Sequence, residues 1–308
     1  MNKLRNFGIM VLAMLMIMAC DNTSSNESSE EGKTVNLEGN DYLVTIKTDL
    51  GEMKAILYDQ TPKHKENFIK LVKDGFYDSL LFHRVMQSFM IQGGDPESKN
   101  AAPGQRLGTG GPGYTIPAEF IPSLFHKKGA LSAARQPTEV NPQRASSGSQ
   151  FYIVQGQVLS EADLSQFTGP NYQAIGQAIQ YLRAALPDHD LNREFQEAYD
   201  QGGDEAFEQK VLASVDRLEE ATGRKLQNPP MSSEAIEAYQ TVGGTPFLDQ
   251  DYTIFGQVIQ GLEVIDAIAA VQTAPGDRPV EDVRMYISIE EMPKKEIAEK
   301  YGYDFSIQ

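Results

Sequence analysis

The sequence is poor in the residues on which many catalytic and metal sites depend. Its 308 residues include one cysteine, Cys20, and four histidines, so no intramolecular disulfide can form and we expect no metal site. It has no Gly-x-Ser-x-Gly motif, and the glycine-rich stretch at 108–113 lacks the lysine of a phosphate-binding loop. We therefore expect no cofactor and no catalysis by a cysteine nucleophile.

Positive charge is also scarce. The chain has 27 Lys and Arg against 43 Asp and Glu, a net charge of −16. Such a surface repels phosphates and anionic lipid headgroups, so we expect no nucleic-acid partner. With 40% hydrophobic residues the chain can still bury a sizeable core, as one large domain or two ordinary ones.

The N-terminus has the pattern of an export signal. Lys3 and Arg5 precede an apolar run at 9–19, which is short for a membrane span but suits a secretory signal. The run ends in Ile-Met-Ala-Cys, which resembles the bacterial lipoprotein box, in which the cysteine is lipidated and becomes the first mature residue. We predict a signal peptide at 1–19 and acyl chains such as palmitate on Cys20. An ordinary signal peptide with an incidental cysteine is the alternative.

Residues 20–40 carry acidic and small polar residues and almost no large apolar ones. They cannot bury enough surface to fold, so we expect an acidic, disordered tether that begins at the lipidated cysteine. The predicted localisation is the cell envelope, on a bacterial membrane, facing the periplasm or the cell surface. The lipid anchor is the only membrane contact we expect.

The next part of the chain has the pattern of short strands and few helices. Alternating apolar residues at 42–59 surround Asp-Leu-Gly and predict a hairpin, and 61–75 predicts a helix capped by Thr61 and ended by Gly75. A second short helix at 261–271 places Leu262, Ile265 and Ile268 on one side. Four further strands are expected at 129–135, 148–154, 252–259 and 282–292. This pattern favours a closed antiparallel barrel over a parallel sheet.

A helical pattern interrupts the strands. Residues 157–246 contain 15 acidic and 6 basic residues, which contribute 6 − 15 = −9 to the net charge. A first helix has one apolar stripe, a second is interrupted at Gly202–Gly203, and a third is capped by Ser232 or Ser233. We predict a helical insertion whose stripes pack among the helices and against the barrel, with a partner-binding groove as the alternative. The first stripe consists of Tyr172, Ile175, Ile179, Leu182 and Leu186.

Five motifs, in this order, resemble the cyclophilin-type peptidyl-prolyl cis–trans isomerases. They are FHRVMQSFMIQGGDP, GTGGPGYTIPAEF, GALSAAR, SSGSQFYIV and FLDQDYTIFGQVIQGLEVID. The resemblance implies a mainly β fold, an eight-stranded antiparallel barrel capped by two helices. Placed on this chain, it predicts a barrel at 41–156 and 245–293, an α-helical insertion at 157–244 and a C-terminal tail at 294–308.

The resemblance also implies the residues of a proline-binding groove. Arg84 matches the catalytic arginine, Gln92 and Gln150 match polar groups at the groove, and Phe151 is a neighbour that faces the barrel. Ala134 and Arg135 match a stretch that pairs with the substrate backbone. The pocket and its rim are implied to consist of Phe89, Met90, Tyr152, Phe247, Leu248 and Tyr252.

Three of these positions depart from the family pattern. Tyr152 stands at the position of a phenylalanine on the pocket floor, and its hydroxyl needs a hydrogen-bond partner beside an apolar ring. Phe247 stands where many members have tryptophan, and Tyr252 where many have histidine. We expect an active enzyme with an altered pocket.

The chemistry fits these residues. Rotation about a peptide bond has a barrier of about 18–20 kcal/mol, and no bond is made or broken, so neither a nucleophile nor a metal is needed. Arg84 can donate a hydrogen bond to the proline nitrogen in the twisted state, although a core ion pair is the alternative role for its charge. We predict a monomeric isomerase that acts on proline-containing polypeptides during the folding of exported proteins.

A second hypothesis is a proline-recognising binding module or holdase chaperone. In that case turnover is incidental and clients bind the helical insertion. An isomerase assay with the Arg84→Ala variant separates the two hypotheses.

Overall fold

The computed structural model describes residues 37–307. The chain separates into two units, Met1–Val35 and Asn36–Gln308, and the described residues all lie in the second. The predicted signal peptide at 1–19, Cys20 and most of the predicted tether lie outside the described residues.

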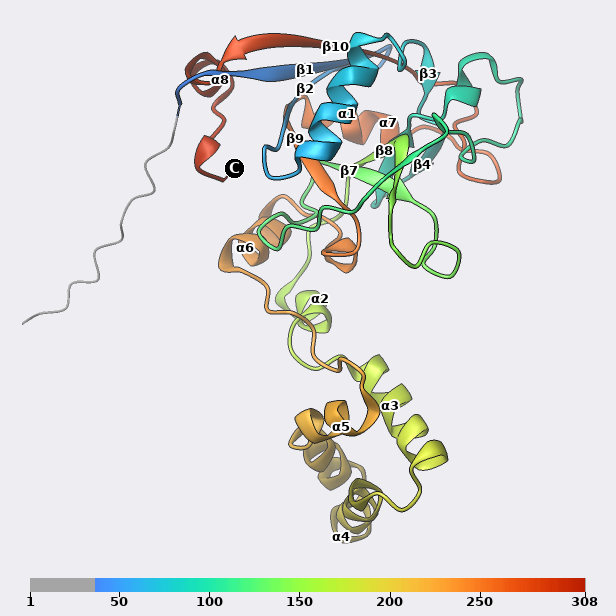
Figure 1. Ribbon diagram of the computed structural model, residues 1–308, viewed down its shortest axis with the longest axis vertical. Coiled ribbons are helices and arrows are strands. Elements are labelled where there is room, and N and C mark those ends of the chain that lie inside the picture. Colours follow the sequence, from blue (N-terminus) through green and yellow to red (C-terminus); the bar gives the residue numbers. More distant parts are fainter. Residues whose placement is uncertain (1–36, 308) are drawn as a thin grey trace, which may run out of the picture. The chain divides into compact units, whose positions relative to one another are not determined.

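The described chain contains a ten-stranded antiparallel sheet (Figure 1). The strand order is β3-β10-β1-β2-β9-β7-β8-β5-β4, and β6 pairs with β8. The strands are β1 (Asn40–Thr48), β2 (Gly51–Leu57), β3 (Leu80–Leu81), β4 (Arg84–Met86), β5 (Met90–Gly93), β6 (Thr115–Ile116), β7 (Ala130–Arg135), β8 (Ser146–Val154), β9 (Ile254–Gln260) and β10 (Arg284–Pro293).

The mainly β, antiparallel fold is confirmed, but the predicted count of eight strands and the closed barrel are wrong. The sheet has ten strands and forms a curled half-barrel. The two edge strands of the sheet, β3 and β4, are very short. They follow each other in the chain but do not pair with each other. The backbone at this point bonds to the segment before β10 instead: Phe82 N–H donates to the Val283 carbonyl at 2.9 Å and Val85 N–H to the Asp277 carbonyl at 2.7 Å.

The predicted hairpin is β1 and β2. Val44 and Ile46 face the core opposite Ala55 and Met53, because alternate side chains of a strand point to the same face. Gly51 follows the two-residue turn with a φ of +139°. A side chain there would place its Cβ 2.6 Å from Val264, so both the backbone conformation and the packing require glycine.

Two helices pack against the sheet, as predicted. Helix α1 (Pro62–Lys73) buries Phe68, Leu71 and Val72, and helix α7 (Leu262–Ala269) buries Ile265 and Ile268 in the same core. Thr61 is the N-cap residue of α1, but the prediction that its side chain caps the helix is wrong. Its hydroxyl donates to the Tyr58 carbonyl at 3.4 Å and is directed back into the preceding turn.

Apolar residues form separate cores on the two faces of the sheet. Phe151 lies in the core with Phe68 and Phe255, whereas the next residue along β8, Tyr152, lies in a second cluster with Met90 and Leu248. Strand alternation therefore divides β8 between a structural face and a face that borders a cavity.

Five helices lie in the chain between β8 and β9. Part of this segment has its own core, formed by side chains such as Ile175, Leu182 and Leu218, and another part contacts Phe125 through Leu164 and Tyr239. The helices are α2 (Glu161–Leu164), α3 (Tyr172–Ala185), α4 (Asp190–Leu212), α5 (Val215–Thr222) and α6 (Ser233–Thr241), with the short 3-10 helices η2 (Ser165–Phe167) and η3 (Pro246–Leu248).

The helical pattern is predicted well, with one error. The break at Gly202–Gly203 is present as non-helical backbone within α4, and Ser232 caps α6 by accepting from Ala235 N–H. Ile175, Ile179 and Leu182 of the predicted stripe are buried and Leu186 is partly buried, but Tyr172, the first residue of α3, is exposed.

The chain ends in a short helix. Helix α8 (Lys294–Tyr301) and the 3-10 helix η4 (Phe305–Ile307) follow β10, and Ile297, Tyr303 and Phe305 pack in the second core. A further 3-10 helix, η1 (Pro96–Asn100), lies earlier in the chain, between β5 and β6. No helix within 37–307 combines the length and apolar character needed to cross a bilayer.

We expect Phe68→Ala to lower the free energy of unfolding by about 3–5 kcal/mol, because the ring fills space among three other aromatic rings and nothing nearby can collapse into the cavity. Phe68 lies 5.1 Å from the Tyr77 ring, 5.6 Å from Phe151 and 5.4 Å from Phe255, measured between ring centroids. Urea denaturation followed by circular dichroism measures the change. Leu50→Ala, at an exposed turn position, is the control and should change little.

Candidate active site

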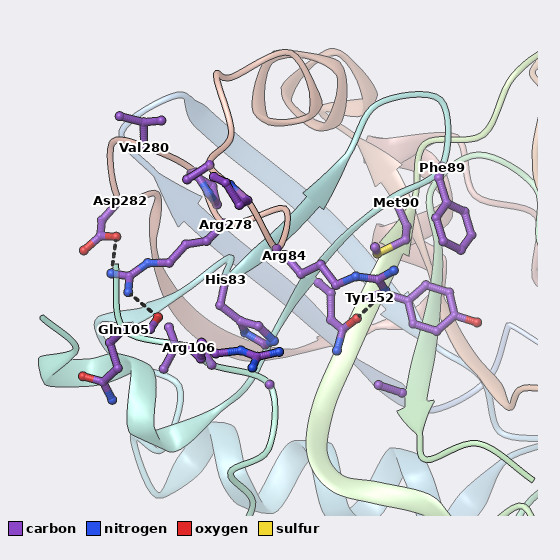
Figure 2. Close-up of a pocket in the computed structure, with 18 of the residues that line it drawn as sticks. His83, Arg84, Phe89, Met90, Gln105, Arg106, Tyr152, Arg278, Val280 and Asp282 are labelled. Carbon is purple, nitrogen blue, oxygen red and sulfur yellow. Dashed lines mark hydrogen bonds and ion pairs between the residues drawn. The ribbon is translucent and has the colours of Figure 1, made fainter. Parts of the chain in front are cut away.

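Strand β4 explains how a charged residue fits an apolar stretch. Arg84 is paired with Gln92 across β4 and β5, and Val85 with Ile91. Val85 and Ile91 are buried in the core, so alternation places Arg84 and Gln92 on the opposite face. The guanidinium therefore leaves the core and reaches the edge of a cavity (Figure 2).

A row of polar groups holds Arg84. Its guanidinium donates to Gln92 Oε1 at 3.3 Å and to the Met86 sulfur at 3.0 Å. Gln92 in turn donates to Gln150 Oε1 at 3.0 Å, and Gln150 donates to the Gly110 carbonyl at 2.7 Å. The row ends on backbone, so the side chains that orient Arg84 are themselves fixed.

Arg84 is not part of a buried ion pair. Its Nε lies 3.6 Å from Asp277, but the two side chains are 40% and 43% exposed, so solvent screens most of their attraction. The alternative of a core ion pair is therefore wrong, and the charge is available at the cavity.

An apolar cup lies beside the guanidinium. Phe89, Met90, Tyr152 and Leu248 line the same cavity, which has a volume of about 750 Å³. Met90, Tyr152 and Leu248 are buried. The cup is thus an apolar surface with the partly exposed Arg84 guanidinium beside it.

Two aromatic residues and an arginine that forms an ion pair lie beside the cup. Phe247 is 57% exposed and lies 5.6 Å from Phe89 between ring centroids. Tyr252 packs edge-on to Tyr152 at 5.9 Å and carries Arg135 over its ring. The Arg135 side chain also forms an ion pair of 2.7 Å with Asp251, so it is engaged with the protein.

Most of the predicted residues of the folded part line the cavity, but Gln150 and Phe247 do not. Gln150 lies behind Gln92, and Phe247 lies against Phe89 and lines a different pocket. The cavity itself is lined by Arg84, Phe89, Met90, Gln92, Ala134, Arg135, Tyr152, Leu248 and Tyr252.

The cavity extends beyond the predicted groove into a second lobe, which the sequence did not reveal. Its lining includes His83, the loop 103–108 and the loop 274–282. Arg278 holds the two loops together by donating to the Ala102 and Gln105 carbonyls at 3.0 and 2.9 Å. The two loops are some 170 residues apart in the sequence, so their contact could not be predicted from it. The one local signal is the i,i+4 spacing of Arg278 and Asp282, which form an ion pair.

The Tyr152 hydroxyl has the partner that its burial demands. It lies 3.0 Å from His126 Nε2, and the two rings are stacked, with 9° between their planes. Burial raises the pKa of Tyr152 well above its ordinary value, so the phenol stays protonated. The floor of the cup therefore presents the ring, while the hydroxyl is directed toward His126.

The family model of the cyclophilin-type peptidyl-prolyl cis–trans isomerases matches residues 43–182 and 221–288. The chain belongs to this family. The resemblance of the five motifs is thereby confirmed, and membership supports an isomerase. The match includes both ends of the predicted insertion at 157–244, up to residue 182 and again from residue 221. The family model therefore does not mark 157–244 as an insertion, and the insertion stays a prediction.

Bacterial relatives agree with the family assignment. A Staphylococcus saprophyticus protein named "Putative peptidyl-prolyl cis-trans isomerase" is 30% identical over 80% of this chain and 90% of its own length. A Streptococcus pyogenes protein named "Putative bifunctional phosphatase/peptidyl-prolyl cis-trans isomerase" is 31% identical over 78% of this chain. The match spans only 37% of that longer protein.

Two solved cyclophilin structures show a weak likeness to this chain. Two structures of a Cryptosporidium parvum cyclophilin-type isomerase, one in the presence of the dipeptide Ala-Pro, are 20% and 19% identical, with TM-scores of 0.45 and 0.46. They cover 80% and 82% of this chain and 98% and 99% of their own. A likeness at this level adds nothing to the assignment.

Within residues 37–307, no three His, Cys, Asp or Glu side chains gather where they could bind a metal ion.

His83 makes the stability of the protein depend on pH. Burial lowers its pKa from 6.5 to about 4, against the opposing influence of Asp95. The unfolded chain therefore binds a proton at His83 between pH 6.5 and 4 that the folded chain does not. We therefore expect the free energy of unfolding to keep the full His83 contribution above pH 6.5 and to lose it as the pH is lowered toward 4. The total loss is about 3 kcal/mol, at 1.36 kcal/mol per pH unit.

We expect His83→Gln to flatten this dependence, because the substituted side chain does not titrate. The measurement is the free energy of unfolding in urea at pH 7, 6, 5 and 4. Both proteins retain His64, His126 and His189, so the difference between their pH profiles reports His83 alone. Parallel profiles would contradict the assignment.

Proposed function

We propose that this protein accelerates the cis–trans isomerisation of X–Pro bonds in polypeptides and that Arg84 is its catalytic residue. The observation that carries the proposal is one cavity in which an exposed guanidinium borders a buried apolar cup. A proline ring fits the cup, and the amide that precedes it then lies toward Arg84.

The mechanism follows from the electronic structure of the amide. Resonance gives the C–N bond partial double-bond character and a barrier of about 18–20 kcal/mol. In the twisted state the proline nitrogen becomes pyramidal and regains its lone pair. A donor that bonds to this nitrogen stabilises the twisted state more than either planar isomer, which is the condition for catalysis.

Arg84 meets this condition with little reorganisation. The guanidinium is always ionised, and Gln92 and Met86 already hold two of its nitrogens. Met90, Tyr152 and Leu248 bury the ring and hold one side of the bond while the other side turns.

The isomerase is preferred to a holdase because of where the charge lies. A surface that only recognised proline would need the apolar cup, but it would not need a donor held in a fixed orientation at the cup's edge. The row from Arg84 through Gln92 and Gln150 to the Gly110 carbonyl orients that one group.

We expect Arg84→Ala to lower kcat/KM roughly 100-fold on a proline tetrapeptide, because removing one preoriented donor costs roughly this factor in other enzymes. A protease-coupled cis/trans assay measures the rate. Arg84→Lys keeps the charge but loses the planar fork, and we expect it to recover only part of the activity.

Arg193→Ala is the matched control, since this arginine is 68% exposed on α4. It should retain full activity. If the unaltered protein gives no acceleration, or Arg84→Ala retains full activity, the proposed function is wrong.

We further propose that the protein acts on exported polypeptides from the face of a bacterial membrane. The support is the sequence of residues 1–40: a signal peptide, Cys20 at its end, and an acidic tether long enough to separate the enzyme from the lipid surface. Two or more acyl chains on one cysteine give stable anchoring, whereas one chain gives only marginal binding.

We expect Cys20→Ala to abolish incorporation of labelled palmitate in bacterial cells and to move the protein from the membrane fraction to the soluble fraction. Cell fractionation and fluorography measure both effects. Ser24→Ala, within the same tether, should leave them unchanged. A Cys20→Ala protein that stays in the membrane fraction contradicts lipid anchoring.

A further inference from the structure

A chain of polar groups, all buried except the partly exposed Asp249, leads from the floor of the cavity to helix α6. Tyr152 Oη lies 3.0 Å from His126 Nε2, and His126 Nδ1 lies 2.8 Å from Asp249 Oδ1. Tyr239 of α6 donates its hydroxyl hydrogen to Asp249 Oδ2 at 2.6 Å. Four side chains from four different segments are thus connected by three short contacts.

When His126 is neutral, the hydrogens in this chain have one consistent arrangement. Asp249 accepts the Tyr239 hydroxyl and also the backbone N–H of His126 at 2.8 Å, so it acts as a carboxylate. His126 Nδ1 must then carry a hydrogen that it donates to Asp249. In a neutral imidazole Nε2 is left as an acceptor, and the Tyr152 hydroxyl donates to it.

The partners of Tyr152 are firmly held. His126 and Tyr239 are both fully buried, and Thr245 N–H donates to the His126 carbonyl at 2.9 Å. Gly244 packs so closely that a side chain on it would collide with the His126 carbonyl and the Tyr239 ring. None of these groups lines the cavity, so they contact a bound proline only through Tyr152.

We propose that His126, Asp249 and Tyr239 are positioning residues that orient Tyr152 in the proline cup, so that helix α6 helps to determine the shape of the pocket. The hydroxyl of Tyr152 is directed away from Arg84 (Figure 2). Without an acceptor at His126 the hydroxyl would turn to the Ser132 side chain beside it and shift the ring, because a buried hydroxyl without a partner is costly.

This role affects substrate binding and leaves the chemical step unchanged. The cup holds the proline ring equally in the planar and twisted states, whereas Arg84 acts on the twisted state. Loss of such uniform binding raises KM and leaves kcat unchanged. The inference rests on the proposed function of the cavity, but it can fail separately.

The test is a double-mutant cycle in the full chain, solubilised in detergent. Tyr239→Phe and Asp249→Asn are made in the natural chain and again in a Tyr152→Phe background, and NMR exchange spectroscopy on an Ala-Pro peptide gives kcat and KM. We expect Tyr239→Phe to raise KM roughly fivefold, which corresponds to about 1 kcal/mol, with kcat within about twofold. In the Tyr152→Phe background the same change should have no effect, because no hydroxyl remains to be oriented.

Tyr77→Phe is the matched control. It removes a buried tyrosine hydroxyl that bonds to the Ser149 carbonyl at 3.2 Å in the other core. Its KM should equal that of the natural chain. An equal rise in KM for Tyr77→Phe, or the same effect of Tyr239→Phe with and without the Tyr152 hydroxyl, overturns the proposal.

A spectroscopic measurement does not depend on activity. Nitrogen NMR of His126 should show hydrogen on Nδ1 and a bare Nε2, and Asp249→Asn should disturb this tautomer. If the natural chain has no isomerase activity, the proposed function fails. The positioning role is then still tested by two measurements, the His126 tautomer and the affinity of the variants for the Ala-Pro peptide. If His126 carries its hydrogen on Nε2 instead, the positioning role fails whatever the activity.

Discussion

The site depends on the register of three neighbouring strands. Arg84 on β4 lies opposite Gln92 on β5, which lies opposite Tyr152 on β8, so the three side chains form a row on one face. A slip of one residue in β5 would turn Ile91 toward the cavity and bury Gln92. Gly94 at the end of β5 opposes such a slip, because its φ is +89° and a side chain on it would collide with the Ser149 carbonyl. The backbone can follow this path only where glycine stands.

The cup is flanked by two polar systems of different character. On one side the row from Arg84 ends on the Gly110 carbonyl of a loop, and the guanidinium stays partly exposed. On the other side the chain from Tyr152 ends on Tyr239, in a fully buried place. In the proposed function, the catalytic donor must reach a substrate that turns, whereas the surface that holds the proline ring works best when it does not move. The difference in burial between the two systems matches these two tasks.

Local pattern predicted much of the fold. The hairpin at 42–59, the helix after Thr61, the later strands and the break at Gly202–Gly203 all depend on period-2 or period-3.6 spacing and on turn residues, which act over a few positions. The errors concern choices made at longer range. The Thr61 hydroxyl could bond forward to the helix or back to Tyr58, and only the path of the preceding turn selects the second. Tyr172 continues an apolar stripe, yet no other helix covers the place where it lies. The strand count depends on how the ends of the sheet meet, which no local pattern specifies.

For this cyclophilin, the sequence by itself determined the family, the residues that the motifs imply for the groove, and the need of Tyr152 for a hydrogen-bond partner. These are properties of residue type and spacing within short segments. Only the tertiary structure decided that His126 is that partner, that Asp249 and Tyr239 stand behind it, and that the loops at 103–108 and 274–282 extend the cavity. The physical reason is sequence distance. Tyr239 and Asp249 reach His126 from more than a hundred residues further along the chain, and nothing but the folding of the intervening helices brings them to the same place.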